Sequence, residues 1–141
     1  MRKHKQIPQA NTDIIKDCQN IKEMRIAIES WLKFSFRDVT IVNRQTKFEI
    51  GFNSKSFKKL VSGSPGQLKL IALTAIHDMI KIGELTKVDV DKKQRSEIIA
   101  YYYFESPVKI EDEVYLFWFT VRQLQNGKFI YSGNLDNKKP L

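Results

Sequence analysis

The sequence has little of the chemistry on which several protein classes depend. Cys18 is its only cysteine, so neither an intramolecular disulfide nor a metal cluster built on cysteine can form. Its two histidines are His4 and His77, and no H-E-x-x-H or paired D-x-D pattern occurs. We therefore expect no metal ion and no cofactor. A single cysteine fits a reducing compartment, and we expect a cytoplasmic location.

Long apolar runs are missing as well. No segment approaches the roughly 20 apolar residues of a membrane span, and the basic N-terminus lacks the apolar core of a signal peptide. Neither a G-x-x-x-x-G-K-[ST] phosphate loop nor a nucleophile elbow is present. We therefore expect no membrane partner, and the sequence does not support P-loop nucleotide hydrolysis or Ser/His/Asp catalysis.

Positive charge is what the sequence has in excess. Its 141 residues carry a net charge of +8, with lysine and arginine concentrated near both ends and at residues 55–59 and 87–95. Such an excess favours a polyanionic partner such as nucleic acid, although basic tails that keep a protein soluble would give the same charge. The length suits one domain. We expect a flexible basic arm at residues 1–13, the domain at 14–136 and a tail at 137–141.

Helical patterns occupy two parts of the chain. Asn20 and Glu23 form a capping-box pattern, and apolar residues at three- and four-residue spacing predict a helix that ends near Phe36. A shorter helical turn is expected at residues 12–18. The sequence SPGQ, with Ser64 as the cap, predicts the start of a long helix that ends at Gly83.

Strand patterns occupy much of the remaining sequence. Residues 39–43 and 47–52 predict a hairpin, whereas residues 98–106, 113–124 and 127–135 predict three antiparallel strands. The polar segment 86–97 is expected to be a loop or a loose hairpin arm. The predicted fold is α+β in the order αββαβββ, with the helices on one face of a curved, mostly antiparallel sheet. On the strand at 113–124, Phe117 and Phe119 share one face and Trp118, Thr120 and Arg122 share the other. One of these faces must pack on the helices, and the other is then free to act as a working surface.

Five stretches of the sequence together resemble a known family. They are FEIGF, FKKLVS at residues 57–62, ALTAIHDMIKIGEL, YYYFESPVKIEDEVYLFWFTVRQ and NGKFIYSGNL. They are similar to the large polyvalent protein-associated domains of phages and mobile elements, which resemble the barnase/EndoU/colicin/RelE-like ribonuclease fold. The resemblance spans about residues 21–135. It implies a metal-independent, toxin-type ribonuclease domain that acts on RNA such as tRNA, is delivered by or carried within a phage, and has an immunity or other protein partner.

Metal-free RNA cleavage needs a base for the 2′-hydroxyl, an acid for the leaving oxygen and a cation for the phosphate. The resemblance implies that Lys59, which matches the family's lysine before the long helix, polarises the phosphate. We expect Arg122 to clamp the phosphate, and His77 or Tyr102 to transfer protons. The further nucleic-acid contacts that we expect are Lys58, Ser62, Tyr131 and Lys128.

Each of these residues also has a purely structural interpretation. Lys58 and Lys59 would also suit a solvated surface turn, and His77 would suit an exposed helix face. Tyrosines are favoured in strands for packing alone. The alternative function is therefore a catalytically inactive module of the same fold that binds nucleic acid or a protein.

Overall fold

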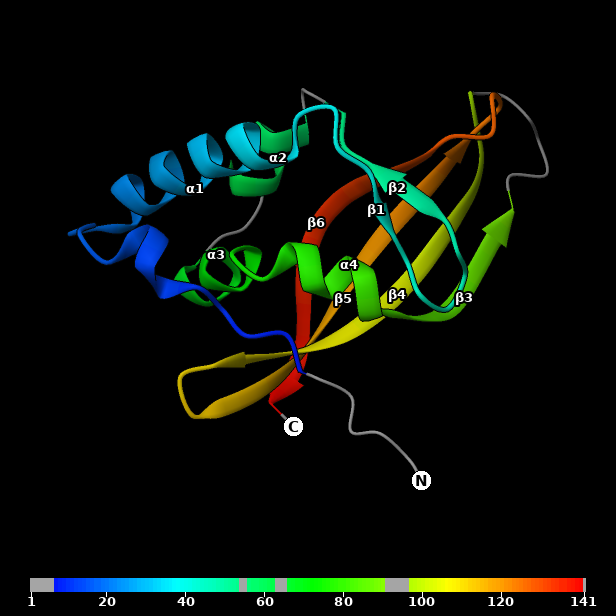
Figure 1. Ribbon diagram of the computed structural model, residues 1–141. Coiled ribbons are helices and arrows are strands. Elements are labelled where there is room, and N and C mark those ends of the chain that lie inside the picture. The colour runs from blue at the N-terminus through cyan, green and yellow to red at the C-terminus, as the bar shows by residue number, and fades with distance from the viewer. Residues whose placement is uncertain (1–6, 54–55, 63–65, 91–96, 141) are drawn as a thin grey trace.

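The computed structural model describes residues 7–53, 56–62, 66–90 and 97–140 (Figure 1). Its first long element is helix α1 (Ile21–Phe36), preceded by the short 3-10 helix η1 (Thr12–Ile15). The Oδ1 atom of Asn20 accepts a hydrogen bond from the backbone N–H of Glu23 at 2.9 Å, and the Glu23 carboxylate accepts one from the backbone of Gln19 at 3.1 Å. The predicted N-cap at Asn20 and the end of α1 at Phe36 are therefore confirmed, and Glu23 completes the cap on the backbone of Gln19 in place of Asn20.

The prediction of one helix from residue 65 to residue 83 is wrong. The chain forms α3 (Gln67–Leu73) and α4 (Ile76–Ile82), and a further helix, α2 (Ser56–Ser62), lies where no helix was predicted. The break follows from Thr74, whose hydroxyl donates to the Ile71 carbonyl at 2.6 Å and accepts from the backbone of Asn11 at 2.8 Å. Such side-chain bonds compete with the helical ladder. The expected cap, Ser64, lies outside the described residues.

The sheet confirms the α+β class, with more strands than predicted. Its order is β1-β2-β6-β5-β4-β3, and every neighbouring pair is antiparallel except β2 and β6, which are parallel. The strands are β1 (Ile41–Val42), β2 (Glu49–Gly51), β3 (Glu84–Val90), β4 (Ile98–Ile110), β5 (Glu113–Leu124) and β6 (Phe129–Pro140). β3 begins before the segment expected to be a loop or a loose hairpin arm and extends into it, because residues 84–90 pair with the long strand β4 as a charged edge strand.

The sheet curls until its two edges approach each other. Gln45, in the β1–β2 hairpin, accepts a hydrogen bond from the backbone N–H of Leu85 in β3 at 2.7 Å. Phe48 of the same hairpin lies against Tyr102 of β4, with ring centroids 4.8 Å apart. Buried Asn43 fixes the hairpin to α4, because its amide donates to the carbonyls of Ile80 at 2.8 Å and Gly83 at 2.9 Å.

The core lies between the helices and one face of the sheet, which we call the inner face (Figure 1). Alternate residues of the long strands point into it and are almost fully buried, as Phe104 of β4, Phe119 of β5 and Tyr131 of β6 show. The residues between them point to the opposite side, which we call the outer face, and several are partly or largely exposed. The predicted division of β5 into a core face and a second, more open face is therefore confirmed.

Both expected terminal segments contain ordered pairing. Within residues 1–13, the backbone of Ala10 donates to the Lys109 carbonyl and Lys109 donates to the Pro8 carbonyl, so this stretch runs beside the end of β4. β6 continues into the expected tail, where Pro140 lies opposite Tyr115. In the part of the chain that the structure describes, no helix is long and apolar enough to cross a membrane.

Candidate nucleic-acid interface

The outer face gathers aromatic and cationic residues from neighbouring strands. Arg122 of β5 lies opposite Tyr101 of β4, and the next outward pair is Thr120 with Tyr103. One step further along β5 is Trp118, opposite Glu105. Because side chains alternate along a strand, these residues lie on one face in adjacent rows.

The rings on the outer face are held by polar partners yet stay accessible. Trp118 is 42% exposed, and its Nε1–H donates to a carboxylate oxygen of Glu105 at 3.3 Å. Tyr103 is partly exposed, and the ammonium of Lys87 from β3 lies 5.6 Å from its ring centroid. An exposed tryptophan and a tyrosine with a nearby cation are groups on which nucleic-acid bases stack.

Arg122 supplies a second cation in the middle of this face. Its side chain is partly buried, its Nε atom is fully covered, and that atom has no hydrogen-bond partner among the described residues. No carboxylate within the described part of the chain forms an ion pair with it. A guanidinium without a carboxylate partner can bind phosphate oxygens through its remaining N–H groups.

Two predicted site residues face the other way. Tyr102 lies on the inner face, where its ring contacts Phe48 and its hydroxyl donates to Gln123 at 2.9 Å. Tyr131 is completely buried and stacks with Phe52 and Phe119, so the expected nucleic-acid contact at Tyr131 is corrected to a core position. In both cases the strand alternation turns the tyrosine toward the helices, away from Arg122.

The remaining predicted residues are exposed but lie in other places. Lys58, Lys59 and Ser62 are on the exposed side of α2, in the helix layer. His77 is on α4, with Nδ1 3.2 Å from the Asp78 carboxylate and its ring stacked on Phe36 at 6.2 Å.

Since the helix layer covers the inner face, the sheet lies between these side chains and Arg122. The four residues expected to act in catalysis are therefore not gathered around one phosphate. Lys128 is exposed in the β5–β6 turn, beside a groove at the end of the outer face.

The opposite end of the sheet is acidic. A hollow of about 570 Å³ between α3 and the β4–β5 turn is lined by Glu111, Asp112 and Glu113. The hydroxyl of Tyr115 donates to Glu113 at 2.8 Å, and this hydrogen bond is the main cause of a raised Tyr115 pKa; desolvation and the nearby negative charges act in the same direction. Such a hollow repels a polyanion.

We next considered whether the described side chains could bind a metal ion. Over residues 7–53, 56–62, 66–90 and 97–140, no group of three or more His, Cys, Asp or Glu side chains is placed to hold a metal ion. Sequence reasoning missed Lys87 because its segment was expected to be a loop or a loose hairpin arm. The signal was present in the alternation of Lys87 and Asp89 with Val88 and Val90.

Comparison with known proteins gives one family match. The model of the family described as large polyvalent protein-associated domain 3 matches residues 19–131. Neither the curated proteins nor the solved structures give a match.

Proposed function

The chain belongs to the large polyvalent protein-associated domain 3 family, and on that premise we propose that it is a nucleic-acid-binding module that holds single-stranded RNA on the outer face of its sheet. The observation that carries this proposal is the arrangement of Trp118, Tyr103 and Tyr101 around Arg122 on neighbouring strands. Aromatic rings and cations on one open sheet face are the groups that bind bases and backbone phosphates together.

The aromatic rings favour single strands over duplexes. Bases inside a duplex are stacked on each other, so a flat ring can stack only on a base that is unpaired. Trp118 and Tyr103 lie on adjacent strands in successive rows, which suits successive bases of one extended strand. Arg122 and Lys87 lie among the rings, where each can neutralise a phosphate.

The net charge of +8 supports the same partner. Lysine and arginine contacts with phosphates release bound counterions, so affinity is expected to fall as salt is raised. The sequence-based ribonuclease, toxin and phage or mobile-element assignments stay predictions. We favour binding over cleavage because Lys59, His77 and Tyr102 lie on the side of the sheet opposite Arg122.

The test compares two exposed aromatic residues on different sides of the molecule. Trp118→Ala removes a ring from the outer face, whereas Phe34→Ala removes a 91%-exposed ring from helix α1. Stacking on one aromatic ring contributes about 1–3 kcal/mol, so Trp118→Ala should weaken binding of a fluorescently labelled single-stranded RNA by about fivefold or more. Phe34→Ala should leave the affinity unchanged, as measured by fluorescence anisotropy.

The possible results distinguish RNA binding from RNA cleavage and from binding of a protein partner. The proposal is supported if single-stranded RNA binds in a salt-dependent way and only Trp118→Ala weakens that binding. Equal effects of the two variants would exclude the outer face as the binding site. Incubation with total tRNA in EDTA tests cleavage, and products with cyclic-phosphate ends would restore the ribonuclease prediction. Failure to bind or cleave RNA would leave a protein partner as the remaining alternative.

A further inference from the structure

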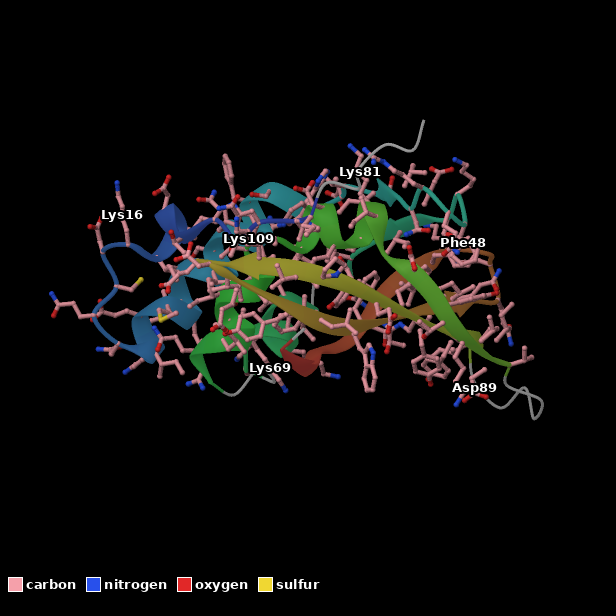
Figure 2. All side chains as sticks on the ribbon, turned by 90° about the horizontal axis from the view of Figure 1, so that it is seen from below. Lys16, Phe48, Lys69, Lys81, Asp89 and Lys109 are labelled. Atoms are coloured by element: carbon pink, nitrogen blue, oxygen red, sulfur yellow. The ribbon has the colours of Figure 1, made fainter. Side chains whose placement is uncertain are left out.

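A groove of about 700 Å³ opens where the β1–β2 hairpin meets the β5–β6 turn. Figure 2 shows Phe48 of this hairpin and Asp89 of β3 toward one end of the molecule, and Lys16 at the opposite end. The groove residues that matter for its chemistry are Asp38, Thr40, Lys47, Glu49, Gly51, Lys128 and Ile130.

The floor of the groove is open because β2 carries a glycine there. A Cβ atom at Gly51 would lie 3.5 Å from Cγ2 of Thr40 and 3.9 Å from Cδ1 of Ile130. These are ordinary van der Waals distances, so the fold tolerates a small side chain at this position. A larger side chain would occupy the space above Ile130 that the groove now offers to a ligand.

The charges of the groove favour a nucleoside over a bare anion. Lys47 and Lys128 supply two cations, and Asp38 and Glu49 supply two carboxylates. None of the four forms an ion pair with another described residue, and together their formal charges cancel. Carboxylates accept hydrogen bonds from ribose hydroxyls and base N–H groups, while the apolar floor suits the base itself.

The groove continues the outer face without a break. Gly51 of β2 lies opposite Ile130 of β6, and Ile130 lies opposite Arg122 of β5. Adjacent strands are about 4.8 Å apart, so Arg122 lies one strand spacing from Ile130 and two from Gly51. One nucleotide strand can therefore contact both the outer face and the groove.

We propose that the groove receives one ribonucleotide of the strand held on the outer face, which makes RNA the preferred ligand over DNA. The base lies over Gly51 and Ile130, the 2′-hydroxyl donates to the Glu49 carboxylate, and the phosphate lies between Lys128 and Arg122. DNA lacks the 2′-hydroxyl, so it leaves this carboxylate without its donor. The inference rests on the proposed function, because it places the nucleotide in a strand that the outer face already binds.

The experiment measures the affinities of the full chain for an RNA hexamer and a DNA hexamer of matching sequence. Glu49→Ala removes the carboxylate in the groove. Glu113→Ala removes an equally charged, exposed strand carboxylate next to the β4–β5 turn, at the opposite end of the sheet (Figure 1). Gly51→Val fills the groove, and thermal unfolding shows whether that variant is folded. RNA should bind at least about fivefold more tightly than DNA, as one charge-assisted hydrogen bond gives.

The expected result is that Glu49→Ala and folded Gly51→Val abolish the preference for RNA, and that Glu49→Ala leaves the DNA affinity within about twofold. Glu113→Ala should keep the preference, since the negative charge and the Tyr115 hydrogen bond that it removes are distant from the groove. Persistence of the preference in Glu49→Ala, or its absence in the unaltered protein, overturns the groove assignment while RNA binding by the outer face stands. If the unaltered protein binds neither hexamer, the proposed function fails as well.

Discussion

Adjacent tyrosines in β4 have different environments although their side chains are identical. Tyr101 and Tyr103 lie on the outer face, opposite Arg122 and Thr120, whereas Tyr102 between them packs on Phe48 in the inner layer. The cause is the two-residue period of a strand. A single residue's sequence neighbourhood therefore says little about its role, because the face on which it lies decides whether it packs or binds.

At Gly83, close packing leaves no space for a side chain. A Cβ atom there would lie 2.8 Å from the Met79 carbonyl oxygen and 2.8 Å from Cζ of Phe119. We expect Gly83→Ala to lower the free energy of unfolding by about 1–3 kcal/mol, as overpacking does in other cores. Urea denaturation followed by circular dichroism measures the change.

Gly51→Ala is the matched control for that prediction, because its Cβ would meet only ordinary contacts. Replacing a strand glycine by alanine should leave stability unchanged or raise it by about 0.5–1 kcal/mol. Equal destabilisation by the two substitutions would show that the close contacts around Gly83 have no energetic consequence.

At the scale of elements, the side chain of one asparagine holds the β1–β2 hairpin to α4, beside a backbone hydrogen bond from Arg44 to the Lys81 carbonyl at 2.9 Å. The Asn43 amide donates to two carbonyls at the end of α4, and its Oδ1 atom accepts from the backbone and hydroxyl of Thr46, each at 2.9 Å. Since Asn43 is completely buried, no solvent can replace these partners. The hairpin forms one wall of the groove, so this contact also positions Glu49 and Gly51.

We expect Asn43→Ala to destabilise the protein by about 2–4 kcal/mol, because several hydrogen bonds are lost and buried carbonyls are left unsatisfied. The comparison is Asn20→Ala, which removes the exposed N-cap of α1 and should cost about 1 kcal/mol. Denaturant unfolding of both variants measures which substitution lowers the free energy of unfolding more. A loss at Asn43 no larger than that at Asn20 would mean that apolar packing and the hydrogen bonds of Arg44 and Gln45 hold the hairpin without Asn43.

Several elements could be predicted from the sequence and others could not. Helix α1 was predictable because its cap and its apolar stripe are local signals. The break at Thr74 was not, since its hydroxyl binds the backbone of Asn11, which is 63 residues away in the sequence. Strand β3 was expected only as a loop or a loose hairpin arm, because its alternation of charged and apolar residues is short and its pairing with β4 depends on residues further along the chain.

At the scale of the whole molecule, the fold places cations on two opposite sides, the helix layer and the outer face of the sheet. Lys58 and Lys59 are exposed in the helix layer, whereas Arg122 lies among the rings of the outer face. If net charge alone attracted RNA, the side on which a cation lies would have little effect on affinity. If the outer face holds the strand, a cation on that face contributes more than one in the helix layer.

We therefore expect Arg122→Gln to weaken single-stranded RNA binding by about tenfold, the effect of losing a charge-assisted contact. The double variant Lys58→Gln/Lys59→Gln removes twice as much positive charge and should weaken binding by less than about threefold, through general electrostatics alone. Fluorescence anisotropy at two salt concentrations measures both effects. A larger loss in the double variant would move the binding site to the helix layer.

Local signals were enough to predict the class of the fold, the first helix, the two faces of β5 and the basic net charge, because capping, periodicity and charge are local or additive properties. They did not determine which distant residues meet. Only the tertiary structure placed Tyr102 and Tyr131 in the inner layer, separated Lys59 and His77 from Arg122, and joined Gly51 to Ile130 beneath a groove. The reason is that the curl of the sheet and the pairing of β2 with β6 depend on contacts between residues far apart in the chain.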